Sequence, residues 1–170
     1  MANKHLEFEA LVHAYSVDLY RYAYWLCKEK SLAEDIVQET FVRAWKALDK
    51  LKDAKAAKAW LITIMRREMA RHFKKYPAVD LPLDEVEDIQ NEEGLDSVSS
   101  IALHQAIATL PAEYCEPLLL QVLGGYSCNE IAEILNINPG AVMTRTFRAR
   151  QKLHRLLGDE QTELRLVRNK

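Results

Sequence analysis

The sequence predicts an all-α protein with two small helical domains, a three-helix bundle and a helix-turn-helix unit, joined by a flexible acidic linker. Glycine and proline number only five each among 170 residues, and the runs between them are rich in helix-forming residues. Apolar residues recur at intervals of three and four positions, which is the period of an amphipathic helix. An acidic stretch without lysine or arginine divides the two halves. We therefore expect domains at 1–76 and 98–158, a linker at 77–97 and a tail at 159–170.

The first domain begins with two predicted helices. The first helix covers Leu6 to Lys28, with apolar positions at Phe8, Leu11, Val12, Tyr15, Leu19, Tyr22, Ala23 and Leu26. In the second helix, which runs to about Leu51, Ser31 is expected to cap the N-terminus and Glu34 to complete a capping box. The apolar stripe of this second helix comprises Leu32, Ile36, Val37, Phe41, Ala44, Trp45 and Leu48.

A short polar stretch, Asp49–Ala54, precedes the third helix, which is predicted over Lys55–Tyr76. Its expected buried positions are Trp60, Leu61, Ile64, Met65 and Phe73. Pro77 and Pro82 end this helix, because proline lacks the backbone donor. The segment that follows has too few large apolar groups to fold alone, and its eight acids are Asp80, Asp84, Glu85, Glu87, Asp88, Glu92, Glu93 and Asp96.

The second domain begins where helical periodicity resumes near Val98. Pro111 is expected to start the next helix, which runs through Leu123 and ends at the Gly124-Gly125 pair. Pro117 lies inside this helix and should bend it or shift its start.

The stretch from Tyr126 to Leu157 is predicted to be a helix-turn-helix that reads duplex DNA in the major groove. Ser127 and Glu130 form a capping box for the first of its helices. A three-residue turn ends at Asn138, which caps the second helix, and Pro139 takes the first helical position. The second helix of such a motif lies in the groove, where its N-terminal residues reach base edges.

The last helix is expected to bury Val142, the aliphatic part of Thr146, Ala149 and Leu153. This leaves Thr144, Arg145, Phe147, Arg148 and Lys152 exposed. Arginine pairs bidentately with guanine, threonine and phenylalanine touch thymine methyl groups, and the other bases neutralise phosphates. The alternative interpretation is a solvated basic face on an ordinary helical bundle.

The formal net charge of −2 conceals an uneven distribution of charge. Seven bases and a single acid, Glu68, lie between Lys55 and Lys75, and five bases with no acid lie between Arg145 and Arg155. The sequence therefore predicts two basic surfaces joined by an acidic connector.

Other function classes find little support in the sequence. The three cysteines, Cys27, Cys115 and Cys128, match no metal or redox spacing, and we expect them to be buried small hydrophobes, with a thiol sensor as the alternative. The five histidines are scattered, and no glycine-rich phosphate loop occurs. There is no signal peptide or long apolar run. We expect a cytoplasmic protein that is not an enzyme and has no cofactor, metal or small-molecule substrate.

Several motifs in both halves of the sequence resemble those of a known protein family. Residues 33–45, AEDIVQETFVRAW, are similar to the region-two signature of bacterial sigma factors, and residues 60–67, WLITIMRR, resemble the promoter-melting helix that follows it. The sequences at 110–113, 125–127, 130–132 and 145–150 look like region four. With only these two regions and a short linker, the chain resembles the extracytoplasmic-function (ECF) class of the sigma-70 family from about Phe8 to Leu157.

The resemblance implies a role for each basic or polar surface. A polar face would bind the clamp of core RNA polymerase through Asp35, Gln38, Glu39 and Arg43. The loop at 49–54 would capture a flipped base of the minus-ten element. The bases that would recognise and melt this element are Lys50, Lys52, Lys55, Lys58, Arg66, Arg67 and Arg71. Trp60 is in register with the core, and stacking on a base is the alternative. The minus-thirty-five element would contact Ser127, Asn129, Pro139, Gly140, Thr144, Arg145, Phe147, Arg148 and Lys152.

The resemblance also implies partners: the polymerase clamp and flap, promoter DNA, and an anti-sigma factor of the kind often tied to the membrane. When active, such a protein associates with the nucleoid. The chain departs from the family pattern at Arg67, Cys115 and Met143, where asparagine, arginine and a basic residue are respectively usual. Two alternative functions are a sigma-like decoy that sequesters an anti-sigma factor and an autonomous helix-turn-helix regulator.

Overall fold

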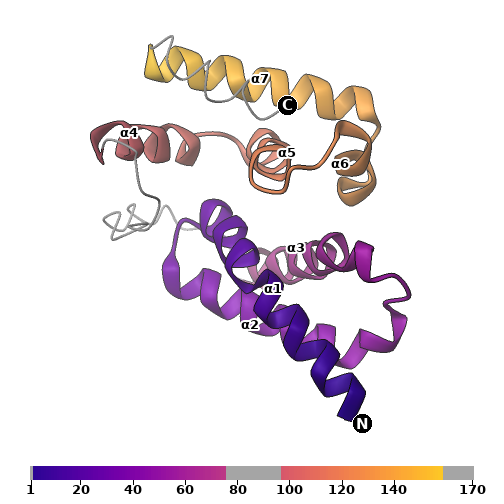
Figure 1. The fold of residues 1–170 in the computed structure, drawn as a ribbon. Helices are drawn as coiled ribbons and strands as arrows, with labels where there is room; N and C mark the ends of the chain where they lie inside the picture. The colour runs from indigo at the N-terminus through magenta and orange to yellow at the C-terminus, as the bar shows by residue number, and fades with distance from the viewer. Residues whose placement is uncertain (1, 76–96, 159–170) are drawn as a thin grey trace. The chain divides into compact units, whose positions relative to one another are not determined.

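A computed structural model describes residues 2–75 and 97–158, and these form seven α-helices, two short 3-10 helices and no strand (Figure 1). The all-α prediction is confirmed. The chain divides into two compact units, residues 1–82 and 83–170. The expected linker at 77–97, except for Ser97, and the expected tail at 159–170 lie outside the described residues.

The first unit is built on helices α1 (Ala2–Cys27), α2 (Lys30–Ala47) and α3 (Ala57–Lys75), which all pack against one another. Two single-turn 3-10 helices, η1 (Leu48–Lys50) and η2 (Ala54–Ala56), connect α2 to α3. The core side chains come from each helix at three- and four-residue spacing, as the amphipathic pattern requires: Leu19, Tyr22, Ala23, Ala33, Ile36, Val37, Phe41, Ala44, Leu48, Ala57, Leu61, Ile62, Met65 and Met69.

The predicted capping box at Ser31 is wrong. Helix α1 is followed by a left-handed residue, Lys28, with φ 60°, whose N–H donates to the Tyr24 carbonyl at 2.7 Å. This sharp turn lets α2 start at Lys30, with Glu29 in the capping position and no side-chain cap. Ser31 therefore lies inside the first helical turn, where it cannot act as the cap.

The predicted burial of Phe73 is also wrong, because this side chain is 38% exposed. Successive four-residue steps advance about 40° beyond a full turn, so a stripe that starts at Ala57 has rotated away from the core by position 73. Glu68, on the preceding part of α3, faces inward instead and is buried, as are Ile62 and Met69. Trp60 and Ile64, also expected to be buried, are half-buried. Trp45, expected on the apolar stripe of α2, is 38% exposed, so that expectation is wrong as well.

The second unit contains α4 (Ser97–Ala108), α5 (Ala112–Val122), α6 (Cys128–Leu135) and α7 (Pro139–Leu157). Helix α7 packs against each of the other three, and α5 also contacts α6. The described core consists of Ala106, Ile107, Leu110, Cys115, Leu118, Leu119, Leu120, Ile131, Ala132, Leu135, Val142, Ala149 and Leu153. Pro111 caps α5 instead of occupying its first turn, and Pro117 is buried inside the helix.

Two glycines shape the turn between α5 and α6. Gly125 has φ +67°, a conformation that residues with side chains rarely adopt. A Cβ on Gly124 would lie 2.6 Å from the Leu120 carbonyl oxygen, which accepts a hydrogen bond from the Tyr126 N–H at 3.3 Å. The turn therefore needs glycine at both positions, and it delivers the chain to the start of α6.

Candidate nucleic-acid and protein interfaces

The predicted caps of the helix-turn-helix are confirmed. The Ser127 N–H donates to Glu130 Oε2 at 2.7 Å, and the Glu130 N–H donates to Ser127 Oγ at 3.3 Å. The hydrogen bonds from the Ser127 backbone and then from its side chain lower the pKa of the Glu130 carboxyl below its ordinary value. At the turn, Asn136 is left-handed with φ 55°, which lets the chain reverse within three residues.

The second cap fixes the start of α7. Asn138 Oδ1 accepts a hydrogen bond from the Ala141 N–H at 2.7 Å, and Pro139 is the first helical residue. Gly140 is exposed immediately after it, as is Asn129 on α6. These residues, with Ser127, surround the N-terminal ends of the two helices, which is the part of such a motif that approaches a DNA groove.

The predicted sidedness of α7 is confirmed. Val142, Thr146, Ala149 and Leu153 are all buried. Thr144, Phe147, Arg148 and Lys152 are exposed, and Arg145 is half-buried. The helix therefore presents a basic and partly apolar face away from its own core, and the accessible arginines are available for an anionic partner.

Two bases of α7 have partners inside the second unit. The Arg150 guanidinium donates to Gln121 Oε1 on α5. The Lys152 ammonium lies 5.1 Å from the centre of the Tyr114 ring, within the range of a cation–π contact. Lys152 thus has an internal contact that sequence reasoning did not anticipate, while the side chain is still exposed enough to reach a phosphate.

The bases predicted to contact the minus-ten element differ in their surroundings. Lys50, Lys52, Lys55 and Arg67 are exposed, and the first three lie on or between η1 and η2. Lys58 forms an ion pair with Asp18 of α1 at 2.9 Å, and Arg66 is half-buried. The Asp53 carboxylate accepts a hydrogen bond from the Lys55 backbone N–H at 2.9 Å, which starts η2 and orders the end of this loop.

On α2, the residues predicted to bind polymerase form an exposed polar row. Asp35, Gln38 and Glu39 are exposed, and Arg43 follows Glu39 by one turn. The Arg43 Nε lies 3.3 Å from Glu39 Oε1. Arg43 does not simply point into solvent, however, because its guanidinium also turns towards α3.

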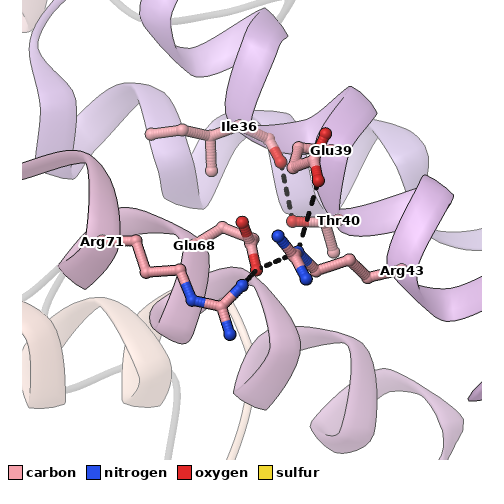
Figure 2. A network of polar contacts seen from close by, with 6 residues as sticks. All are labelled: Ile36, Glu39, Thr40, Arg43, Glu68 and Arg71. Atoms are coloured by element: carbon pink, nitrogen blue, oxygen red, sulfur yellow. Dashed lines mark hydrogen bonds and ion pairs between the residues drawn. The ribbon is translucent and has the colours of Figure 1, made fainter.

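Figure 2 shows the polar network that joins α2 to α3. Glu68, only 7% exposed, forms ion pairs with Arg43 and with Arg71, the latter at 2.9 Å, and both arginines reach the same carboxylate oxygen. Nearby, the buried Thr40 hydroxyl donates to the Ile36 carbonyl at 2.7 Å. A buried carboxylate is costly unless it is paired, so the two arginines allow Glu68 to occupy an inward position of α3.

Sequence reasoning missed two residues that hold predicted site residues in place, Asp18 and Glu68, and it also missed Gln121, which binds Arg150 in the second basic block. A signal existed only for Glu68, which is the single acid within a basic helix and lies three residues before Arg71. Nothing local in the sequence pairs Lys58 with Asp18, 40 residues away, or Arg150 with Gln121, 29 residues away.

The three cysteines are free thiols; Cys115 is buried as expected, but Cys27 and Cys128 are half-buried, so the expectation of burial is wrong for these two. Burial, and then the Glu29 charge, raise the pKa of Cys27 to about 12, so this thiol stays protonated at neutral pH. Within residues 2–75 and 97–158, no group of three or more histidine, cysteine, aspartate or glutamate side chains is placed to hold a metal ion. None of the described helices has both the length and the apolar character needed to span a bilayer.

Comparison with known families gives two matches. Residues 11–76 match sigma-70 region 2, and residues 100–153 match sigma-70 region 4. The first match covers α2, α3 and most of α1. The second covers α5, α6 and most of α4 and α7.

Curated proteins with similar sequences are sigma factors. The chain is 35% identical over 161 residues to the ECF RNA polymerase sigma factor BldN of Streptomyces coelicolor, covering 90% of this chain but only 61% of that protein. It is 32% identical over 171 residues to the ECF RNA polymerase sigma factor SigW of Bacillus subtilis, covering 89% of each.

Solved structures with a similar fold include two protein complexes. The sigma factor RpoE of Bartonella quintana, in complex with the anti-sigma factor NepR, matches with a TM-score of 0.72 and 26% identity over 94% of this chain and 99% of that one. CnrH, in complex with the cytosolic domain of CnrY, matches with a TM-score of 0.64 and 26% identity, covering 90% of this chain and 88% of CnrH.

Proposed function

The chain belongs to the extracytoplasmic-function class of the sigma-70 family, and on this premise we propose that it directs core RNA polymerase to specific promoters and helps to open them. The observation that carries the proposal is the geometry of α6 and α7. Two side-chain-capped helices separated by a three-residue turn present an exposed basic face. That is the arrangement with which a helix-turn-helix enters the major groove.

We assign recognition of the minus-thirty-five element to the second unit. Arg148 is exposed at the middle of α7, and an exposed arginine on a helix in the major groove can pair with guanine O6 and N7. Arg145 and Lys152 supply charge for phosphates. The remaining contacts are assigned to Ser127, Asn129, Pro139, Gly140, Thr144 and Phe147.

We assign the minus-ten element and strand opening to the first unit. Single-stranded recognition needs cations that follow the backbone and a place for unstacked bases. The exposed bases Lys50, Lys52, Lys55 and Arg67 around η1, η2 and α3 support this role. The other members of the proposed set are Lys58, Arg66 and Arg71, of which Lys58 pairs with Asp18 and Arg71 with Glu68.

The polar row on α2, Asp35, Gln38, Glu39 and Arg43, is the proposed contact with the polymerase clamp, and the second unit would contact the flap. We infer that the chain also binds an anti-sigma factor, since the similar sigma factor RpoE is seen in complex with the anti-sigma factor NepR. In this proposal the protein works in the cytoplasm by binding alone, without breaking a bond in DNA. We also propose that the chain consists of region 2 at 1–76, a linker at 77–97, region 4 at 98–158 and a tail at 159–170.

The test is run-off transcription with core polymerase over a promoter library. The native chain should direct initiation at a defined set of promoters, and Arg148→Ala should reduce initiation there by about tenfold, the value of one bidentate guanine contact. The matched control is Arg155→Ala, which removes the same charge from an exposed position in the last turn of α7 and should change initiation little. If the native chain directs no initiation, the assignment fails, and binding to an anti-sigma factor alone would then favour a decoy.

A further inference from the structure

Helix α7 carries an exposed strip that is free of charge. Gly140, Met143, Thr144 and Phe147 follow one another at offsets of three, four and seven, so they share one side of the helix at about 100° per residue. Met143 and Phe147 are 61% and 59% exposed, which is unusual for two large apolar side chains one turn apart. We call these four residues the apolar strip.

The other two members of the apolar strip also lack free polar groups. The Thr144 hydroxyl donates to the Gly140 carbonyl at 3.0 Å, so its proton is used within the helix and its methyl group remains for contact. Gly140 has no side chain and is exposed, so nothing at this position holds a partner away from the backbone. The apolar strip is therefore suited to close contact with an apolar group.

A second strip, at a different angle on the same helix, is basic. Arg145, Arg148 and Lys152 are related by offsets of three and four, and no acid occurs between Pro139 and Leu157. A partner of α7 must therefore be anionic, and it must also offer small apolar groups beside its anionic groups. In the major groove of DNA, the apolar group displayed on base edges is the C5-methyl of thymine.

We propose that Met143 is a specificity-determining residue that, beside Phe147, contacts thymine methyl groups in the minus-thirty-five element. This inference rests on the proposed function and deepens it, because it names the chemical group that the exposed methionine recognises. The basic strip holds phosphates and guanine, while the apolar strip distinguishes thymine from the other bases. Burial of one methyl group by such a contact corresponds to about a fourfold difference in affinity.

The test uses holoenzyme made from core polymerase and the full chain, on the preferred minus-thirty-five sequence. Each thymine is replaced in turn by deoxyuridine, which removes only the methyl group. Native holoenzyme should lose about fourfold in affinity at one position or more. Met143→Ala should still bind, but should no longer distinguish thymine from deoxyuridine at that position.

Two further variants make the result specific. Leu156→Ala is the matched control, because Leu156 is a similarly exposed apolar residue, at 56%, near the C-terminal end of the same helix. It should keep the native discrimination. Met143→Lys should lose the discrimination and steepen the dependence of log affinity on log salt by about 0.9, the value of one added phosphate contact.

The proposal is overturned if native holoenzyme binds every deoxyuridine substitution as well as the thymine parent, if the preferred element contains no thymine, or if Met143→Ala discriminates as well as the native chain. These results leave the proposed function intact, since binding and initiation are still observed. Absence of initiation by the native chain is a different result, and it would overturn both.

Discussion

The ion pair between Arg43 and Glu68 gives the most quantitative prediction. Replacing Arg43 by methionine keeps the aliphatic volume but removes one of the two cations that neutralise a carboxylate with 7% exposure. The remaining partner, Arg71, has a side chain that is 58% exposed and therefore well solvated. Loss of a partner to a buried charged group costs from about 1 to 3 kcal/mol, rising to about 5 kcal/mol for a wholly buried pair.

Because the Arg43 side chain itself is 42% exposed, the expected cost lies in the lower part of that range, at about 2 kcal/mol. Glu39→Gln is the matched control: it also removes a carboxylate partner of Arg43, but this carboxylate is half-exposed, and the cost should stay below about 0.5 kcal/mol. The double variant Arg43→Met with Glu68→Met should cost less than the sum of the two single changes, because it removes both charges together.

The assay is urea unfolding of the full chain followed by tryptophan fluorescence. All three tryptophans, Trp25, Trp45 and Trp60, lie in the first unit. Their emission therefore reports on unfolding of the first unit even when the full chain is used. The reasoning is refuted if Arg43→Met unfolds at the same urea concentration as the native chain, or if the two single changes are additive. The same measurement is needed before a binding defect of Arg43→Ala is attributed to lost polymerase contact.

Three further predictions concern caps, turns and thiols. Ser127→Ala should destabilise α6 by about 1 kcal/mol and lower the amide protection factors of that helix in hydrogen exchange, and unchanged protection would contradict this account. The variant keeps the Ser127 N–H that donates to the Glu130 carboxylate, so the stabilisation by this carboxylate should remain. Because the pKa of Glu130 is lowered in the folded state, that stabilisation is present above the ordinary value of 4.5 and is lost as pH falls through the lower folded value. Gly125→Ala should lower the free energy of unfolding of the second unit by about 1 kcal/mol, because φ is +67° at this position. The thermal midpoint measured by circular dichroism should fall by several degrees, and an unchanged midpoint would mean that the turn relaxes. The pKa of Cys27 is raised to about 12, so little of this thiol is thiolate at pH 8. Its reaction with iodoacetamide at pH 8, measured by peptide mass spectrometry, should be at least about a hundredfold slower in the native chain than in urea. Similar rates in the two conditions would refute the raised pKa.

Features set by local sequence were predictable, and those set by long-range packing were not. The capping box at Ser127, the Asn138 cap and the inward face of α7 depend on residues within a few positions of one another, and the structure confirms them. The box expected at Ser31 failed because the preceding turn at Lys28 set the start of α2. Burial of Phe73 failed because periodicity alone does not say where a helix leaves its core.

The same distinction limits what can be read from a count of charges. The sequence places seven bases between Lys55 and Lys75, but the fold pairs Lys58 with Asp18 and Arg71 with Glu68. A base that already has an acidic partner releases less free energy on meeting a phosphate, because one ion pair replaces another. Of the proposed minus-ten set, Lys50, Lys52, Lys55 and Arg67 are exposed, whereas the exposed Arg71 is already paired with Glu68. For single-strand binding by the first unit, the plot of log affinity against log salt should therefore have the slope of about four phosphate contacts, at about 0.7 per contact. The sequence alone implies a larger number of contacts and a steeper slope.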